Sequence, residues 1–172
     1  MTKIGLLSDT HSYLPEAVFD HFKAVDEIWH GGDVGDISVL DRLAAFKPLR
    51  GVYGNIDPAA VRSRFPLDNL FFCEEVKVLM RHIGGYPGRY APGVRDLIKK
   101  EKPRLFISGH SHILKIMYDE KLACLHMNPG ACGKQGWHQV QTLVKFAIEG
   151  SNITDCQVIE LGKKSSSAEG PQ

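Results

Sequence analysis

The sequence predicts an α/β fold, in which helices cover β-sheets. Two observations lead to this class: strand and helix patterns alternate in the N-terminal half, and short paired strand patterns follow residue 112. Such alternation implies right-handed crossovers and a parallel sheet covered by helices. A length of 172 residues suits one domain with a core of its own. We therefore expect a single domain over residues 1–162.

The N-terminal half contains two predicted helices between three predicted strands. The first helix begins at Pro15, and the second is capped by Asp36, with Leu40 and Ala44 expected on its inner face. Short apolar runs predict the strands, at residues 3–7, 27–30 and 49–53. This order favours three neighbouring parallel strands.

The remainder of the chain changes character after a loop rich in Gly and Pro at residues 84–93. A strand, a helix and another strand are predicted at 76–80, 94–100 and 104–108. Two antiparallel hairpins follow, pairing 114–118 with 123–127 and 140–148 with 153–161. Residues 163–172 are polar and rich in Ser, which predicts a disordered tail.

Composition excludes several functional classes. Lys plus Arg number 21 against 20 for Asp plus Glu, so no global field would attract nucleic acid or an anionic membrane. The apolar runs are too short to span a membrane, and the N-terminus enters a strand without a secretory pattern, so we expect a cytoplasmic protein. The four cysteines form no C-x-x-C pair and are expected to be free thiols.

Seven polar side chains follow the ends of predicted strands. They are Asp9, His11, Asp33, Asn55, His82, His110 and His112. In open α/β sheets ligands bind beyond the carboxyl ends of the strands, so we expect these side chains to converge at one edge. Glycine precedes three of them, at Gly32, Gly54 and Gly109, and is expected to let the backbone turn sharply there.

Carboxylate oxygen, amide oxygen and imidazole nitrogen together suit Mn²⁺, Fe²⁺, Co²⁺, Ni²⁺ or Zn²⁺ better than Ca²⁺. Seven ligands exceed one tetrahedral site, and they fit two divalent ions that share a bridging carboxylate, which we assign to Asp33. Such a pair of ions generates hydroxide near neutral pH and neutralises phosphate oxygens. The pattern therefore predicts hydrolysis of a phosphate ester.

These motifs resemble the calcineurin-like metallophosphoesterases. The resemblance rests on Asp9-Thr10-His11, Gly32-Asp33, Gly54-Asn55, His82 and Gly109-His110-Ser111-His112, and extends from Ile4 to about Gly133. Ser8-Asp9-Thr10-His11-Ser12 and Asn128-Pro129-Gly130 are similar to the small bacterial and archaeal phosphodiesterase branch, whose fold the Vps29 scaffold proteins share.

The resemblance implies a four-layer αββα sandwich of two mixed β-sheets flanked by helices. It implies one ion held by Asp9, His11, Asp33 and His112, and a second held by Asp33, Asn55, His82 and His110. It also implies a phosphodiesterase that uses a bridging hydroxide, with Mn²⁺ as the expected ion. We expect Asn55 and His82 to act in catalysis.

Two positions depart from the family pattern. Ile56 stands where many relatives have a histidine that protonates the leaving group, so we expect either substrates with good leaving groups or another residue as the acid. Ile83 to Arg89 replaces a shorter turn and is a candidate substrate loop, in which Arg89 would pair with phosphate and Tyr86 would stack on an organic group. An ordinary surface loop is the alternative for both residues.

The functional alternatives are a non-catalytic Vps29-like interaction scaffold and a nuclease. The intact ligand set disfavours the scaffold, and the absence of a basic patch disfavours nucleic acid as substrate. The expected partner is a small phosphodiester or phosphomonoester. Trp137 and His138 are expected either at the rim of the site or at a subunit contact, which leaves a homo-oligomer open.

Overall fold

The computed structural model describes residues 1–163, which form two five-stranded sheets, a small hairpin and four helices. The first sheet contains β1 (Thr2–Leu7), β2 (Glu27–His30), β3 (Leu49–Gly51), β11 (Val140–Glu149) and β12 (Asn152–Lys163). The second contains β4 (Asp68–Cys73), β5 (Val76–Arg81), β8 (Leu105–Ile107), β9 (Leu114–Asp119) and β10 (Cys124–Pro129). The hairpin pairs β6 (Gly85–Tyr86) with β7 (Arg89–Tyr90). The helices are α1 (Ala17–His21), α2 (Ser38–Phe46), α3 (Ala59–Arg62) and α4 (Val94–Glu101).

Both sheets are mixed. The first has the order β12-β11-β1-β2-β3, in which β1, β2 and β3 are parallel and β11 and β12 run antiparallel to their neighbours. The second has the order β4-β5-β8-β10-β9, with β5, β8 and β10 parallel and an antiparallel strand at each edge. Each predicted hairpin therefore extends a different parallel sheet.

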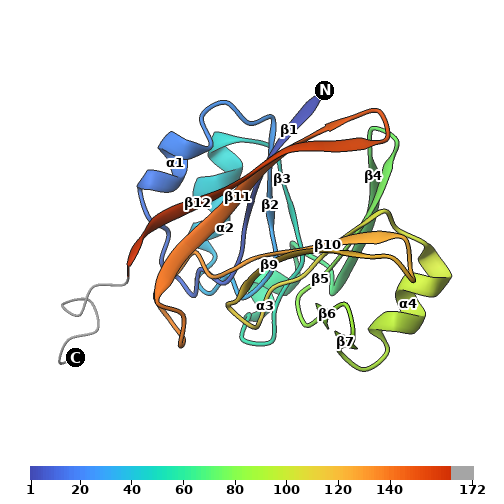
Figure 1. Cartoon of the computed structure of the whole chain (residues 1–172). Helices are drawn as coiled ribbons and strands as arrows, with labels where there is room; N and C mark the ends of the chain where they lie inside the picture. The colour runs from blue at the N-terminus through green and yellow to red at the C-terminus, as the bar shows by residue number, and fades with distance from the viewer. Residues whose placement is uncertain (164–172) are drawn as a thin grey trace.

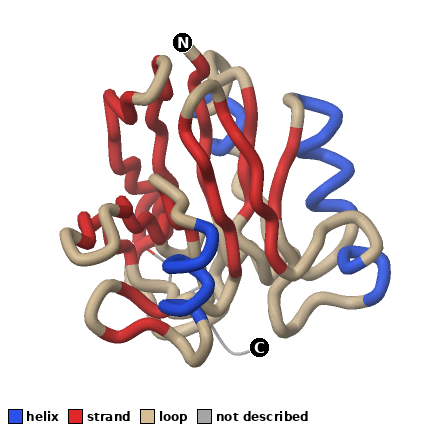
Figure 2. The backbone as a smooth tube through the Cα atoms, turned by 90° about the vertical axis from the view of Figure 1, so that its right-hand side faces the viewer, coloured by secondary structure: helices blue, strands red, loops and turns tan. Residues whose placement is uncertain are grey.

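Four layers result from the way in which these sheets pack. The two sheets enclose one apolar core, while α1 and α2 cover the outer face of the first sheet and α4 covers that of the second. Figure 1 shows α1 and α2 on one side of the strands and α4 on the other, and Figure 2, viewed from the side of α4, shows this helix in front of the strands. The prediction of a helix-flanked α/β sandwich is confirmed.

Strand β1 illustrates why these residues form a buried strand between two layers. Ile4 and Leu6 point into the core between the sheets, whereas Leu7 contributes to the core under the helices. Successive side chains of a strand point to opposite faces, so both faces of β1 are buried. Gly5 lies on the helix side because a Cβ there would come within 2.7 Å of the Phe22 ring.

The structure differs from the sequence prediction in several elements. Strand β4 and helix α3 were not predicted, and the predicted loop 84–93 contains the β6–β7 hairpin. The inner face of α2 was predicted in part wrongly: Leu40 is buried as expected, but Leu43 is buried in place of Ala44, which is exposed. Leucine buries more apolar area than alanine, which favours this rotation of the helix.

The chain termini and cysteines complete the description. Lys163, which was predicted to begin a disordered tail, is instead the last residue of β12, and the rest of the predicted tail, residues 164–172, lies outside the described part. All four cysteines are free thiols, as predicted. Within residues 1–163, no helix has the length and apolar character that a membrane crossing requires.

Candidate metal centre

All seven predicted residues meet, but at the junction of two sheets and not at the edge of one. Asp9 and His11 follow β1, Asp33 follows β2 and Asn55 follows β3, so these four come from the first sheet. His82 follows β5, and His110 and His112 follow β8, so these three come from the second. The carboxyl ends of parallel strands in both sheets thus face the same region.

Close contacts link the two aspartates to three histidines. Asp33 Oδ2 lies 3.1 Å from His82 Nε2 and 3.4 Å from His11 Nε2. Asp9 Oδ1 lies 3.2 Å from His112 Nε2, 3.8 Å from His82 Nε2 and 4.0 Å from His11 Nε2. The carboxylates and the imidazole Nε2 atoms therefore converge on a common space.

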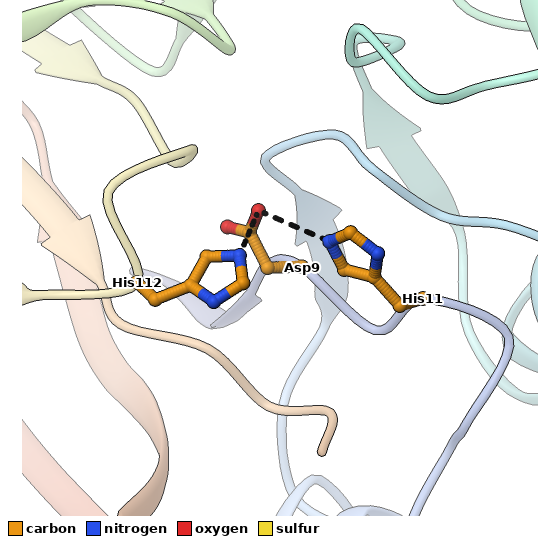
Figure 3. A group of neighbouring side chains, drawn as sticks. All are labelled: Asp9, His11 and His112. Atoms are coloured by element: carbon orange, nitrogen blue, oxygen red, sulfur yellow. Dashed lines mark ion pairs between the residues drawn. The ribbon is translucent and has the colours of Figure 1, made fainter. Parts of the chain in front are cut away.

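Two groups of three residues within this set could each hold an ion. Asp9, His11 and His112 form one group, in which Figure 3 shows the carboxylate between the two rings. Asp33, His82 and His110 form the other, and the ligand atoms of each group lie within 4.8 Å of one another. Asn55 joins the second group because its Oδ1 lies 3.1 Å from His110 Nδ1.

The backbone at these residues is unusual. Asp9, His11, Asp33, His110 and His112 have positive φ angles between 44° and 71°. Such φ values are uncommon for residues other than glycine and cost about 1–3 kcal/mol where the surroundings impose them, which happens mostly at functional sites. The ligand residues themselves therefore make the sharp turns.

This finding corrects the role expected of two glycines. Gly54 and Gly109 are not among the described residues with positive φ, so they do not provide the turns. They provide space instead, because a Cβ at Gly54 would lie 2.0 Å from Asp33 Oδ1 and one at Gly109 would lie 2.7 Å from Asp9 Oδ2. Gly32, with a φ of 102°, serves both purposes, since its Cβ would lie 2.6 Å from His82 Nδ1.

Neighbouring groups hold one atom of several candidate ligands and leave another atom facing the centre. Ser8 Oγ donates to Asp9 Oδ2 at 2.7 Å, and the His110 backbone N–H donates to the same oxygen at 3.2 Å. The Ile56 N–H donates to Asp33 Oδ1 at 3.1 Å. His82 Nδ1 lies 2.7 Å from the Gly31 carbonyl, to which it must donate, so Nε2 is the unprotonated nitrogen of the neutral ring.

Three further buried side chains hold the loops that carry the ligands. Asp57 accepts from the Gly35 N–H at 2.9 Å and from the Gly54 N–H at 2.7 Å, which joins the Asp33 turn to the Asn55 turn. Asn128 donates to the Gly109 carbonyl at 3.0 Å and to Ser111 Oγ at 3.1 Å. Asn128 therefore supports the turn between His110 and His112.

His30 is the third of these side chains. Thr10 Oγ1 donates to the Val34 carbonyl, so the Nε2–H of His30 must donate to Thr10 Oγ1 at 3.0 Å while its Nδ1 accepts from the Gly32 N–H at 3.0 Å. Complete burial lowers the pKa of His30 to about 4, despite nearby carboxylates that raise it. A neutral His30 thus joins the loop after β1 to the loop after β2.

Charges within the centre reinforce one another. Burial raises the pKa of Asp33, but the imidazoles of His11 and His82 outweigh this effect and hold the pKa well below its usual range. Burial lowers the pKa of His82, yet the carboxylates of Asp33 and Asp9 raise it above its usual value. Burial and the nearby His82 lower the pKa of His110. Asp33 is therefore ionised and ready to bind a cation.

The residues fit divalent metal ions. Asp9 Oδ1, His11 Nε2 and His82 Nε2 are buried and have no hydrogen-bond partner among the described residues. A buried polar atom without a partner costs about 1–3 kcal/mol, and coordination of a cation by carboxylate oxygen and imidazole nitrogen would satisfy all three.

The predicted substrate loop lies beside a different surface groove. Arg89 is exposed and lines a groove of about 850 Å³ between α4, β7 and β9, and none of the seven candidate ligands lines this groove. One face of the Tyr86 ring is occupied by Lys115 Nζ, 3.7 Å from the ring centroid. The substrate role of Tyr86 and Arg89 stays a prediction.

Comparison with known proteins places the chain in a family. Residues 2–151 match the model of the calcineurin-like phosphoesterase superfamily domain. The chain belongs to this superfamily. A probable metallophosphoesterase of Methanothermobacter thermautotrophicus is 35% identical to this calcineurin-like phosphoesterase over 164 residues, covering 92% of each chain. One from Methanocaldococcus jannaschii is 36% identical over 134 residues, covering 74% of this chain and 67% of the relative.

Solved structures share the fold of this calcineurin-like phosphoesterase at low identity. Vps29 of Chaetomium thermophilum has a TM-score of 0.74 at 14% identity and covers 95% of this chain and all of its own. The phosphoesterase YfcE of E. coli has a TM-score of 0.59 at 20% identity, covering 83% of this chain and 87% of its own. Family membership and the relatives support metal-dependent hydrolysis of phosphate esters, with divalent ions as cofactors.

Proposed function

We propose that the chain is a phosphodiesterase with a dinuclear metal centre. The observation that carries the proposal is the convergence of Asp9 Oδ1, His11 Nε2 and His82 Nε2, three buried ligand atoms without a hydrogen-bond partner among the described residues. In addition, an ionised Asp33 lies within 3.4 Å of two of these histidines. Buried polar and ionised groups of this kind are costly unless they are paired, and bound cations would pair them.

The two groups of ligands suggest how two ions would be held. One ion would take Asp9, His11 and His112, and the other would take His82, His110 and Asn55, with Asp33 shared between them. Asp33 Oδ2 is the atom suited to sharing, because it faces His11 of the first group and His82 of the second. Nitrogen and oxygen ligands in this mixture favour Mn²⁺, with Fe²⁺, Co²⁺, Ni²⁺ and Zn²⁺ as alternatives.

Two bound ions would supply a bridging hydroxide as nucleophile and neutralise the phosphate oxygens. The residues of the chain fix where this chemistry occurs. Ser8 and the Ile56 N–H hold the non-ligating oxygens of Asp9 and Asp33, and the Gly31 carbonyl fixes the tautomer of His82. Outer contacts of this kind orient metal ligands and commonly change affinity or activity by about 10–100-fold.

Ile56 influences which esters would react. It occupies the position after Asn55 and has no proton to give, so the leaving group must depart without help from this residue. General acid catalysis typically contributes about 10²–10⁴-fold, which is the penalty for substrates that need it. We therefore expect diesters with acidic leaving groups to be the better substrates.

The test uses metal-stripped protein and two p-nitrophenyl esters, the bis ester and the monoester. Mn²⁺, Ni²⁺, Co²⁺, Zn²⁺ and Mg²⁺ are added back singly, and the bound metal is quantified. Restored cleavage that favours the bis ester supports a phosphodiesterase, and preference for the monoester indicates a phosphatase.

Two variants test the centre directly. Asp33→Asn and His82→Ala should remove nearly all turnover and lower the metal content. His126→Ala is the matched control, because His126 is also a buried histidine in the second sheet but contacts Phe106 and not the centre. A folded Asp33→Asn or His82→Ala protein with the wild-type rate in Mn²⁺ contradicts the mechanism.

The alternative is a non-catalytic interaction scaffold, which the fold shared with Vps29 leaves open. A stoichiometric protein partner together with no hydrolysis in the presence of any of the five metals would favour it. The predicted cytoplasmic location and a homo-oligomer stay predictions.

A further inference from the structure

Three exposed isoleucines adjoin residues of the candidate metal centre. Ile56 follows Asn55, Ile83 follows His82 and Ile113 follows His112, and their exposed fractions are 45%, 42% and 62%. They come from three different loops, after β3, β5 and β8. Single exposed apolar residues are common, but several beside one polar centre call for a functional explanation.

An exposed tryptophan lies beside the same centre. Trp137 is 97% exposed, whereas Trp29, the other tryptophan of the chain, is fully buried. Its two neighbours approach His112: a Cβ at Gly136 would lie 2.2 Å from His112 Nδ1, and the centroid of the His138 ring lies 5.1 Å from that of His112. The backbone at Trp137 is therefore held near a candidate ligand by its two neighbours, while the indole ring stays open to solvent.

Arg62, a cationic side chain beside the Asn55 turn, already has partners within the chain. Arg62 donates through Nε to the Asp57 carbonyl and through Nη2 to the Asn55 carbonyl, and its guanidinium lies 4.6 Å from the Tyr53 ring centroid. These contacts use the cation to hold the Asn55 turn. The exposed area of Ile56, Ile83, Ile113 and Trp137 is thus available to whatever is attached to the phosphate.

We propose that Ile56, Ile83, Ile113 and Trp137 form an apolar rim that binds the organic substituents of a phosphodiester, with preference for aromatic ones. The proposal rests on the proposed function and names the substrate class of that site. The rim would adjoin the metal centre, because each rim residue is adjacent in the chain to a candidate ligand or to a residue that contacts one.

The chemistry of the leaving group points in the same direction. In the reaction, water adds to phosphorus, the bond from phosphorus to one ester oxygen breaks, and a phosphomonoester and an alcohol or phenol result, with one proton released. Because Ile56 cannot donate a proton, a departing oxygen that receives no proton from another group leaves as an anion. Phenol-type groups leave as stable anions, and their rings are the groups that the apolar rim would contact.

A pair of substrates with the same leaving group tests the rim. Phenyl p-nitrophenyl phosphate and methyl p-nitrophenyl phosphate both release p-nitrophenolate and differ only in the group that remains. The intrinsic reactivity of each ester is the same for every protein variant, so it cancels when the ratio of their kcat/KM values is compared between variants. Changes in this ratio therefore report contacts with the phenyl group.

Ile56→Ser, Ile113→Ser and Trp137→Ala should each lower the phenyl-to-methyl ratio by about three- to tenfold, since apolar contacts at a partly open site discriminate less than those in a closed pocket. Phe72→Ser is the matched control. Phe72 is 62% exposed but pairs with Lys77 at the start of β5, the end opposite His82, so the ratio should not change. Unchanged ratios in all three rim variants overturn the proposal.

Equilibrium binding provides a readout that does not depend on turnover. Diphenyl phosphate should change the fluorescence of Trp137 at concentrations where dimethyl phosphate does not, and Trp137→Phe should abolish the change. These measurements use the full chain with the metal ion that restores hydrolysis. If hydrolysis is restored but neither the ratio nor the fluorescence responds, the rim proposal fails alone. If no metal restores hydrolysis of either ester, the proposed function fails and the rim proposal with it.

Discussion

Gly54→Ala places a methyl group against the candidate bridging carboxylate. The added Cβ would lie 2.0 Å from Asp33 Oδ1 and 2.3 Å from the Asp33 backbone nitrogen, whereas ordinary contacts begin at 3.4 Å. The neighbour in the way is partly backbone, so a rotamer change alone does not relieve the contact. Either the Asp33 turn or the Asn55 turn must move.

The geometry gives the size of the effect. The distance of 2.0 Å from the added Cβ to Asp33 Oδ1 is about 1.4 Å shorter than an ordinary contact of 3.4 Å. A displacement of about 1 Å at a reacting centre can reduce the rate about 100-fold. Such a movement also separates Asp33 Oδ2 from His82 Nε2, now 3.1 Å apart. We therefore expect kcat/KM for bis-p-nitrophenyl phosphate to fall about 100-fold or more, together with loss of bound metal.

A control with a similar clash separates this effect from general destabilisation. Gly5→Ala would place a Cβ 2.7 Å from the Phe22 ring, in β1 but facing α1, remote from the candidate ligands. It should lower the unfolding temperature while the folded molecules retain their metal content and kcat. Wild-type metal content and rate in Gly54→Ala, or an equal loss of rate in Gly5→Ala, would refute the reasoning.

Two further predictions concern buried polar groups. Asp57→Asn places an amide N–H₂ against one of the two backbone N–H donors that the Asp57 carboxylate accepts from. It should lower the unfolding free energy by about 1–3 kcal/mol, measured by denaturation, and lower kcat, measured in steady-state assays. Burial lowers the pKa of His126 from 6.5 to about 4, so the unfolded chain takes up a proton first as the pH falls. The unfolding free energy should fall by up to about 3 kcal/mol through this window because of His126. His126→Leu should remove that part of the slope in urea unfolding, while the part due to His30 persists; an unchanged slope would mean that His126 already titrates normally.

The convergence of the seven residues could be predicted from the sequence because its signals are local. A polar residue at the end of a strand pattern needs only the position of the strand to be placed, and all seven such residues meet in the structure. That they meet across two sheets was not predictable from strand ends alone. Which strands share a sheet is decided by long-range pairing, such as that of β1 with β11. In this pair Leu6 lies opposite Val144 and Thr2 lies opposite Ile148, so the partners are 138 to 146 residues apart in the chain.

Other features escaped prediction for identifiable reasons. Strand β4 begins with Asp68-Asn69, residues that are typical of turns, and its apolar residues Leu70 and Phe72 are exposed at a sheet edge, so no buried pattern marks it. Its place is fixed by tertiary contacts such as the ion pair between Asp68 and Arg81. Likewise, the hydrogen bonds of His30 and Asn128 depend on loops that are distant in sequence.

Several candidate ligands use one atom for a contact within the protein and leave another atom for the centre, which explains how a folded chain can present a metal centre. Asp9 uses Oδ2 for Ser8 and the His110 N–H, and leaves Oδ1 for the centre. His82 uses Nδ1 for the Gly31 carbonyl and leaves Nε2. Because protein contacts fix the orientation of these side chains, part of the cost of assembling the ligands is met during folding and not during ion binding. The positive φ angles at five of the seven residues are part of that cost, which is why the surrounding hydrogen bonds are as necessary to the centre as the ligands that they hold.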